Sequence, residues 1–67
     1  MAVWVLKEER HYKDGRTETH YHKGFPLGIM HECVFKQEEA RKYKTKREAE
    51  EYRKEYGMTK WEAVKIA

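Results

Sequence analysis

The sequence predicts an α+β fold, in which a small antiparallel sheet of three or four strands is packed by one helix, in the order β-β-β-α-β. Three observations predict it. A turn signal at Asp14-Gly15 separates two strand-forming segments, a capping box at Thr45 begins a helical segment, and strand-forming residues return near the C-terminus. At 67 residues the chain is expected to form a single domain, 1–67.

The first two strands are predicted to form a hairpin around Asp14-Gly15. Residues 3–6 are rich in strand-forming side chains, and such side chains alternate with polar ones over 17–21. Asp-Gly suits a two-residue type I′ turn, because both central residues of that turn need positive φ.

The two-residue turn fixes which residues of the two strands lie opposite each other. It would pair Tyr12 with Thr17 and Glu9 with His20. Neither face of the segment 7–22 is then continuously apolar. The end of the hairpin is therefore expected to project as a solvated ribbon.

A loop and then a third strand are predicted after the hairpin. Gly and Pro mark the loop at 24–28. The strand is expected at about 29–35, or further, towards Tyr43. A last strand is expected at 60–66.

A helix is predicted over about 46–56. Thr45 and Glu48 form a capping box, in which each side chain accepts a hydrogen bond from a backbone N–H at the start of the helix. Gly57 follows as the residue beyond the helix C-terminus. The alternative is one long helix over 36–56, a segment without Gly or Pro, but its apolar residues would lie on opposite sides of that helix before and after Thr45.

The core is expected to be thin and aromatic. Leu, Ile, Val and Phe number only 10 of 67 residues, whereas aromatic residues reach 13%. Trp4, Phe35, Tyr52 and Trp61 are predicted as its main fillers, with Cys33 as a small core residue.

Composition narrows the class of protein. Lys and Arg number 15 against 12 Asp and Glu, so the net charge of +3 is too small for self-repulsion to unfold the chain. No apolar run reaches the ~18 residues of a membrane span, and no signal peptide opens the chain. One cysteine predicts a reducing compartment, hence a cytoplasmic protein with no membrane association.

No catalytic constellation stands out, so we expect neither an enzyme nor a cofactor. Cys33 would need a histidine within hydrogen-bond reach to act as a nucleophile, and a chain this short has little room for a water-excluding pocket. The alternative is a zinc-stapled structural domain. One His-His pair and one His-Cys pair have i, i+2 spacing, which places both members of each pair on one face of a strand. Its ligands would be His20, His22, His31 and Cys33.

The candidate contact residues form two groups, one of cations before the predicted helix and one of cations and tyrosines in the hairpin. Five cations without an acid among them lead into a helix N-terminus, an arrangement that can hold phosphate groups. Tyrosine beside arginine can anchor a protein interface or stack a base, so it does not separate the two kinds of partner. The candidates are Arg41, Lys42, Lys44, Lys46 and Arg47, with Arg10, Tyr12, Lys13, Arg16 and Tyr21.

Residues 43–52, together with Trp4 and Asp14-Gly15, resemble the arm-type DNA-binding domains at the N-termini of phage integrases. That resemblance implies a three-stranded sheet packed by one helix and a sheet that enters the DNA major groove. The segment 24–42 is an insertion relative to that pattern, Tyr43 replaces its usual Phe, and the last strand at 60–66 has no counterpart in it. The Lys/Glu-rich chain also looks like the small free-standing proteins of phages and prophages, many of which inhibit host or defence proteins stoichiometrically.

Taken together, the sequence predicts a non-catalytic interaction module of phage or mobile-element type. The first expectation is stoichiometric binding to a host or defence protein, with inhibition as its consequence. The alternatives are a small DNA- or RNA-binding module that uses 41–47 and the hairpin, and the zinc-stapled domain. Self-association through an edge strand is a further expectation, because a second copy could complete so thin a core.

Overall fold

The fold is α+β, as predicted: a four-stranded antiparallel sheet with one α-helix. In the computed structural model, residues 2–24 and 32–67 are described. The predicted loop over 25–28, the first part of the predicted third strand and His31 therefore lie outside the described residues. The elements are β1 (Trp4–His11), β2 (Thr17–Gly24), β3 (Glu32–Val34), the 3-10 helix η1 (Gln37–Glu39), α1 (Lys46–Glu55) and β4 (Glu62–Lys65).

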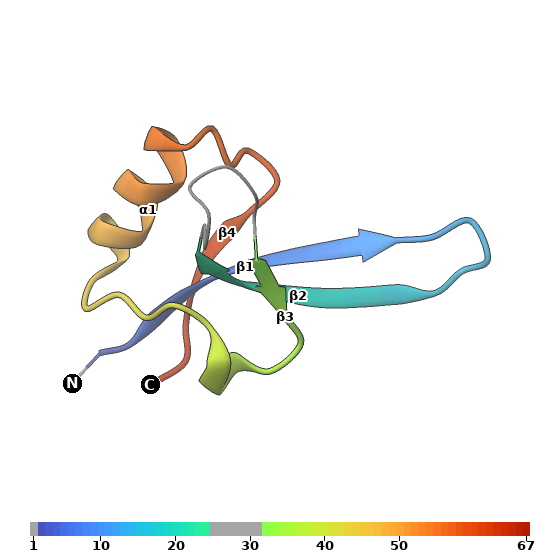
Figure 1. The fold of residues 1–67 in the computed structure, drawn as a ribbon, viewed down its shortest axis with the longest axis horizontal. Helices are drawn as coiled ribbons and strands as arrows, with labels where there is room; N and C mark the ends of the chain where they lie inside the picture. The colour runs from blue at the N-terminus through green and yellow to red at the C-terminus, as the bar shows by residue number, and fades with distance from the viewer. Residues whose placement is uncertain (1, 25–31) are drawn as a thin grey trace.

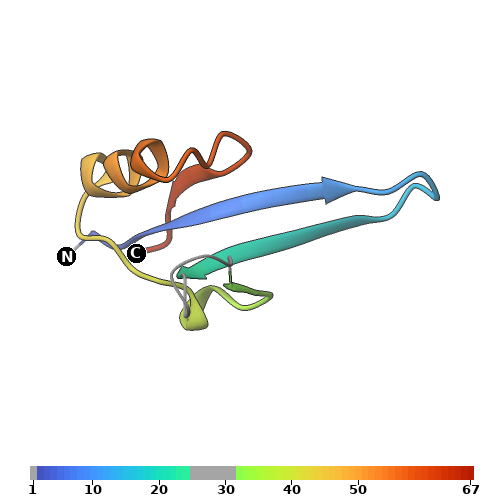
Figure 2. The same ribbon diagram turned by 45° about the horizontal axis from the view of Figure 1, so that its top comes forward.

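The strands lie in the order β3-β2-β1-β4, so that the hairpin forms the centre of the sheet (Figure 1). Helix α1 packs on one face, where it contacts β1 and β4. On the opposite face η1 lies against β2, where the amide of Gln37 donates to the Tyr21 hydroxyl at 3.3 Å (Figure 2). The outer half of the hairpin extends beyond both of these elements.

The predicted hairpin register is wrong by one residue. Arg10 lies opposite Glu18 and His11 opposite Thr17. The turn has three residues instead of two, because only Gly15 has positive φ, at 89°, and the Tyr12 N–H donates to the Arg16 carbonyl across it. A shift of one residue exchanges the two faces of a strand, so the predicted pairing of His20 with Glu9 does not form.

Residues 41–43, here called the crossing segment, fill the gap between the start of β1 and the end of β2. The Arg41 N–H donates to the His22 carbonyl at 3.0 Å. Trp4 and Tyr43 exchange two backbone hydrogen bonds, each of 2.8 Å. The crossing segment thus carries the chain from η1 on one face to α1 on the other.

The helix begins and ends where the sequence predicts. The Thr45 hydroxyl accepts from the Glu48 N–H at 3.1 Å, and Gly57 has φ 63° just beyond the helix. The N–H groups of Gly57 and Met58 then donate to the Lys54 and Arg53 carbonyls, which completes a Schellman motif. The Glu48 carboxylate accepts from the Lys44 N–H, one residue before the position that an ideal capping box uses.

The core lies between α1 and the sheet, and one predicted member is absent from it. Its buried residues are Leu6, Tyr43, Ala49, Met58 and Trp61, with Trp4, Cys33, Tyr52 and Ala63 packed against them. Phe35, a predicted filler, is 69% exposed. The chain turns away from the sheet after Val34, so the Phe35 side chain lies outside the area that α1 covers.

We expect the substitution Thr45→Ala to lower the free energy of unfolding by about 1 kcal/mol, because the Glu48 N–H would lose its capping acceptor. Urea denaturation followed by circular dichroism measures the change. Thr59→Ala is the matched control, since that exposed threonine caps no helix. Equal midpoints for the two variants would contradict the capping role.

Candidate partner-binding surface

A row of side chains follows the hairpin on the face that α1 covers only at its base. Because His22 contacts Trp61 of the core, the alternation of the strand places His20 and Glu18 on that same face. Phe35 joins this row from the end of β3, its ring centroid 4.9 Å from that of His20. Tyr12 completes the row near the turn and is 38% exposed. Here Phe35, His20, Glu18 and Tyr12 are called the ribbon surface.

Glu18 is the polar centre of the ribbon surface. Its carboxylate accepts from the Tyr12 hydroxyl at 2.9 Å and lies 3.2 Å from His20 Nε2. These two hydrogen bonds, that from Tyr12 first, hold the pKa of Glu18 below its ordinary value. Arg16 adds a weaker attraction, with Nη1 3.8 Å from the carboxylate. Glu18 therefore fixes the orientation of its neighbours while it stays anionic.

The hairpin cations predicted as contacts are mostly engaged within the hairpin. The guanidinium of Arg16 lies over the Tyr12 ring, 4.6 Å from its centroid. Arg10 Nε lies 2.6 Å from a Glu8 carboxylate oxygen, and this hydrogen bond raises the pKa of Arg10. Lys13, in the turn, is exposed. The predicted contact Tyr21 lies on the opposite face, half-buried beside η1.

The basic group before α1 lies at the opposite end of the molecule from the hairpin turn, along a longest dimension of 38 Å (Figure 1). Arg41 is stacked over Tyr52 at 4.8 Å, and the Lys42 ammonium donates to the Glu38 carbonyl at 2.6 Å. Arg47 pairs with Glu51 at 3.0 Å on the helix surface. Lys44 and Lys46 are exposed beside the helix N-terminus. The structure does not bring the two predicted contact groups together.

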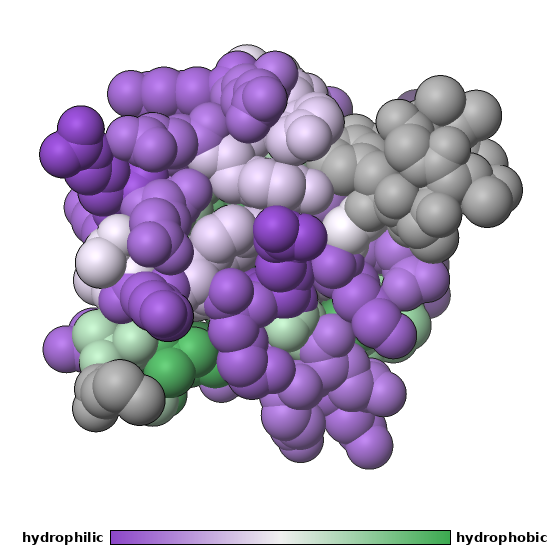
Figure 3. Space-filling model, turned by 60° about the vertical axis from the view of Figure 1, so that its left-hand side comes forward, coloured by the Kyte–Doolittle hydropathy of each residue, from purple (hydrophilic) through white to green (hydrophobic). Residues whose placement is uncertain are grey.

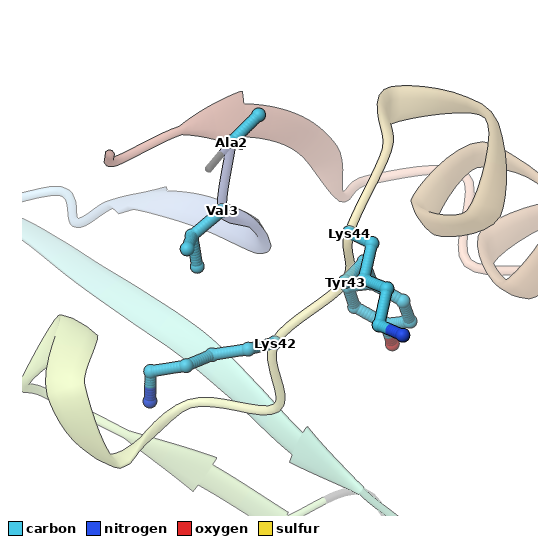
Figure 4. Close-up of a pocket in the computed structure, with 5 residues that line it drawn as sticks. All are labelled: Ala2, Val3, Lys42, Tyr43 and Lys44. Carbon is cyan, nitrogen blue, oxygen red and sulfur yellow. The ribbon is translucent and has the colours of Figure 1, made fainter.

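A cavity of about 480 Å³ opens at the same end, between the start of β1 and the crossing segment. Ala2, Val3 and Tyr43 line it, with Lys42 and Lys44 (Figure 4). The two lysine side chains leave the backbone in different directions on either side of Tyr43, so they do not converge on one point. Figure 3 shows that this end is largely hydrophilic, with a small hydrophobic area low in the view.

Part of the predicted zinc ligand set shares one face of the sheet. His20 and His22 lie on the same face of β2, and Cys33 lies opposite His22 on β3. His20 is held by Glu18, and burial raises the pKa of the Cys33 thiol, which disfavours the thiolate that zinc binds. Within residues 2–24 and 32–67, no three His, Cys, Asp or Glu side chains are grouped closely enough to hold a metal ion.

Sequence reasoning missed both Glu18 and Phe35 as site residues. With the predicted two-residue turn, Glu18 would lie opposite His11 and on the other face of the hairpin from Tyr12, whereas the three-residue turn places Glu18 opposite Arg10 and on the face of Tyr12. For Phe35 a signal exists in the sequence: four polar residues, 36–39, follow it directly and leave no further apolar position to continue the strand into a core.

No family model, curated protein or solved structure matches the chain. Among the described residues no helix has the length and hydropathy needed to cross a membrane.

We expect stability to fall as the pH rises from about 10 to about 12, because burial raises the pKa of Tyr43 from 10.0 to about 12. Below pH 10 the folded and unfolded chains both carry a protonated Tyr43. Between the two pKa values only the unfolded chain ionises it, so about 2–3 kcal/mol of stability is lost over that interval.

Urea midpoints measured across this pH range test the expectation, with Tyr43→Phe as the matched variant. The variant should lose less stability over the interval than the parent chain does. A residual slope is expected from Tyr52, whose pKa burial also raises. Identical slopes for the two chains would contradict the assignment to Tyr43.

Proposed function

We propose that this chain is a non-catalytic interaction module that binds another protein stoichiometrically through the ribbon surface. The observation that carries the proposal is the 69% exposure of Phe35. In keeping with the resemblance to small phage and prophage proteins, the proposed partner is a host or defence protein, which the binding inhibits.

The exposure of Phe35 is costly for so small a protein. Burying a phenylalanine stabilises a fold by about 1.5–3 kcal/mol, and the core here has few aliphatic residues with which to compensate. Exposed aromatic side chains supply much of the binding energy at protein interfaces. Phe35 also stands in an ordered row with Tyr12, whose hydroxyl is fixed by Glu18, so two aromatic anchors would be held in place before binding.

Nucleic acid is the second candidate partner, and Lys44 and Lys46 favour it, because both are exposed beside the N-terminus of α1. Glu48, Glu51 and Glu55 line a groove next to this end together with Arg41, which reduces the attraction for phosphate. The protein partner is therefore favoured over the nucleic acid.

The test is capture from a bacterial lysate by the tagged chain, with and without nuclease. We expect a protein retained in a fixed molar ratio, insensitive to nuclease, and reduced about tenfold or more by Phe35→Ser, as for a hot-spot residue. Tyr56→Ser is the matched control, because Tyr56, the residue that caps the C-terminal end of α1, is 49% exposed and is not part of the ribbon surface. This control should retain the partner.

Two outcomes would overturn the proposal. Loss of all retained material after nuclease treatment would assign the binding to nucleic acid. Equal capture by the parent chain and by Phe35→Ser would remove the ribbon surface from the interaction.

A further inference from the structure

Strand β2 has an open outer edge over Thr17–Thr19. Strand β3 pairs with β2 only from Tyr21 to Gly24, so within the described residues no strand lies beside the first part of β2 on that side. The open stretch belongs to the part of the hairpin that projects beyond α1 and η1 (Figure 2).

The backbone groups of Thr17 and Thr19 face this open edge. In an antiparallel pair, alternate residues hydrogen-bond to the neighbouring strand and the residues between them point the other way. The Tyr12 N–H donates to the Arg16 carbonyl at the hairpin turn, which sets the even-numbered residues of β2 towards β1. Two N–H groups and two carbonyls of Thr17 and Thr19 are therefore directed to where a further strand would lie.

Phe35 lies at the end of β3, where the pairing of β3 with β2 stops and the open edge begins. It follows the last residue of β3 and contacts His20, which directly precedes Tyr21, the first residue of β2 that pairs with β3. A strand added in line with β3 would run beside Thr17–Thr19, with its middle residue opposite Glu18. That residue would share the face of Glu18 and His20 and would lie next to the Phe35 ring.

The chemistry of this position favours arginine. Its aliphatic part could pack on the exposed Phe35 ring, and its guanidinium could pair with the Glu18 carboxylate. Arg16 approaches one Glu18 oxygen at only 3.8 Å and lies over Tyr12. His20, which contacts both Glu18 and the Phe35 ring, lies between them, so the incoming guanidinium would reach Glu18 from the open outer edge of β2, beside His20.

A second copy of this chain does not fit the same edge in the register that pairs Thr17 with Thr19. Two identical antiparallel strands related by a twofold axis pair each residue with the one equally distant from the centre, and the centre of the open stretch is Glu18. Thr17 would then pair with Thr19 of the other copy, and the two Glu18 carboxylates would lie directly opposite each other, which is destabilising.

We propose that the outer edge of β2 binds an extended strand of the partner, which adds to the sheet beside Thr17–Thr19 and carries an arginine opposite Glu18. This strand addition specifies the partner of the proposed function and rests on that function.

The direct test uses a peptide and needs no known partner. The probe is the blocked heptapeptide Thr-Val-Thr-Arg-Thr-Val-Thr, titrated into the isotope-labelled full chain. We expect the amide signals of Thr17 and Thr19 to shift and their hydrogen exchange to slow about tenfold at saturation. The same peptide with Glu in place of Arg should bind at least about tenfold more weakly. Equal binding of the two peptides, or no change at these amides, would overturn the proposal.

Substitutions by proline separate the two edges of the hairpin. Thr19→Pro removes an N–H that points to the proposed edge and should abolish the shifts. Glu9→Pro is the matched control, because the backbone of Glu9 points to the outer edge of β1, and it should leave peptide binding intact. The amide spectrum verifies that each variant is folded, and Phe35→Ser, which leaves the backbone unchanged, should weaken the Arg peptide selectively.

The lysate capture distinguishes this proposal from the proposed function. If the captured partner requires Phe35 but tolerates Thr19→Pro, the result would support binding through the ribbon surface and overturn strand addition. If the peptide binds but no protein is captured, the result would support strand addition at the β2 edge and contradict the proposed function.

Discussion

The crossing segment is the constraint on which the rest of the structure depends. Its hydrogen bonds to His22 and Trp4 close the open end of the hairpin, where β1 and β2 separate. The same three residues place the Tyr43 side chain in the core and lead directly to Thr45, which begins α1. Because one short segment joins the two faces of the sheet, the positions of η1 and α1 are coupled through it.

The crossing segment also determines where the core ends. Helix α1 starts beside the base of the hairpin and contacts β1 and β4, so its apolar side chains cover only that part of the sheet. Beyond it the hairpin is stabilised by short-range polar contacts, such as those of Glu18 with Tyr12 and His20. An exposed contact such as that of Glu18 with Tyr12 contributes little to stability, so the ribbon is ordered chiefly by its continuity with the covered half.

The predictable parts of the fold are those that local sequence determines. The hydrogen bonds that Thr45 and Gly57 make at the two helix ends join groups within five residues of each other, and both ends can be predicted from these two residues. The position of the hairpin can also be predicted, but Asp14-Gly15 is compatible with two turn types whose loops differ in length by one residue. That single residue decides which face Glu18 occupies, and with it the composition of the candidate site.

Phe35 shows a second limit of sequence reasoning. Its neighbours predict a strand, and an aromatic residue in a strand is expected in a core. Its exposure follows from how far β3 runs beside β2 before η1 begins, which depends on contacts between segments distant in sequence. The local sequence pattern thus predicts Phe35 in the core, whereas the fold leaves it outside the core.

The charges of the hairpin bear on what its open edges can bind. Arg10 lies at the centre of the stretch of β1 beyond β4, and Glu18 lies at the centre of the stretch of β2 beyond β3. On either edge, pairing with an identical strand in the register centred on that residue places like charges opposite each other, which is a recognised protection against edge-to-edge association. The same charge attracts a strand with the opposite sign at its centre. A single residue on each edge can therefore oppose self-association and select a partner, and on β2 the exposed Phe35 adds apolar contact to that selection.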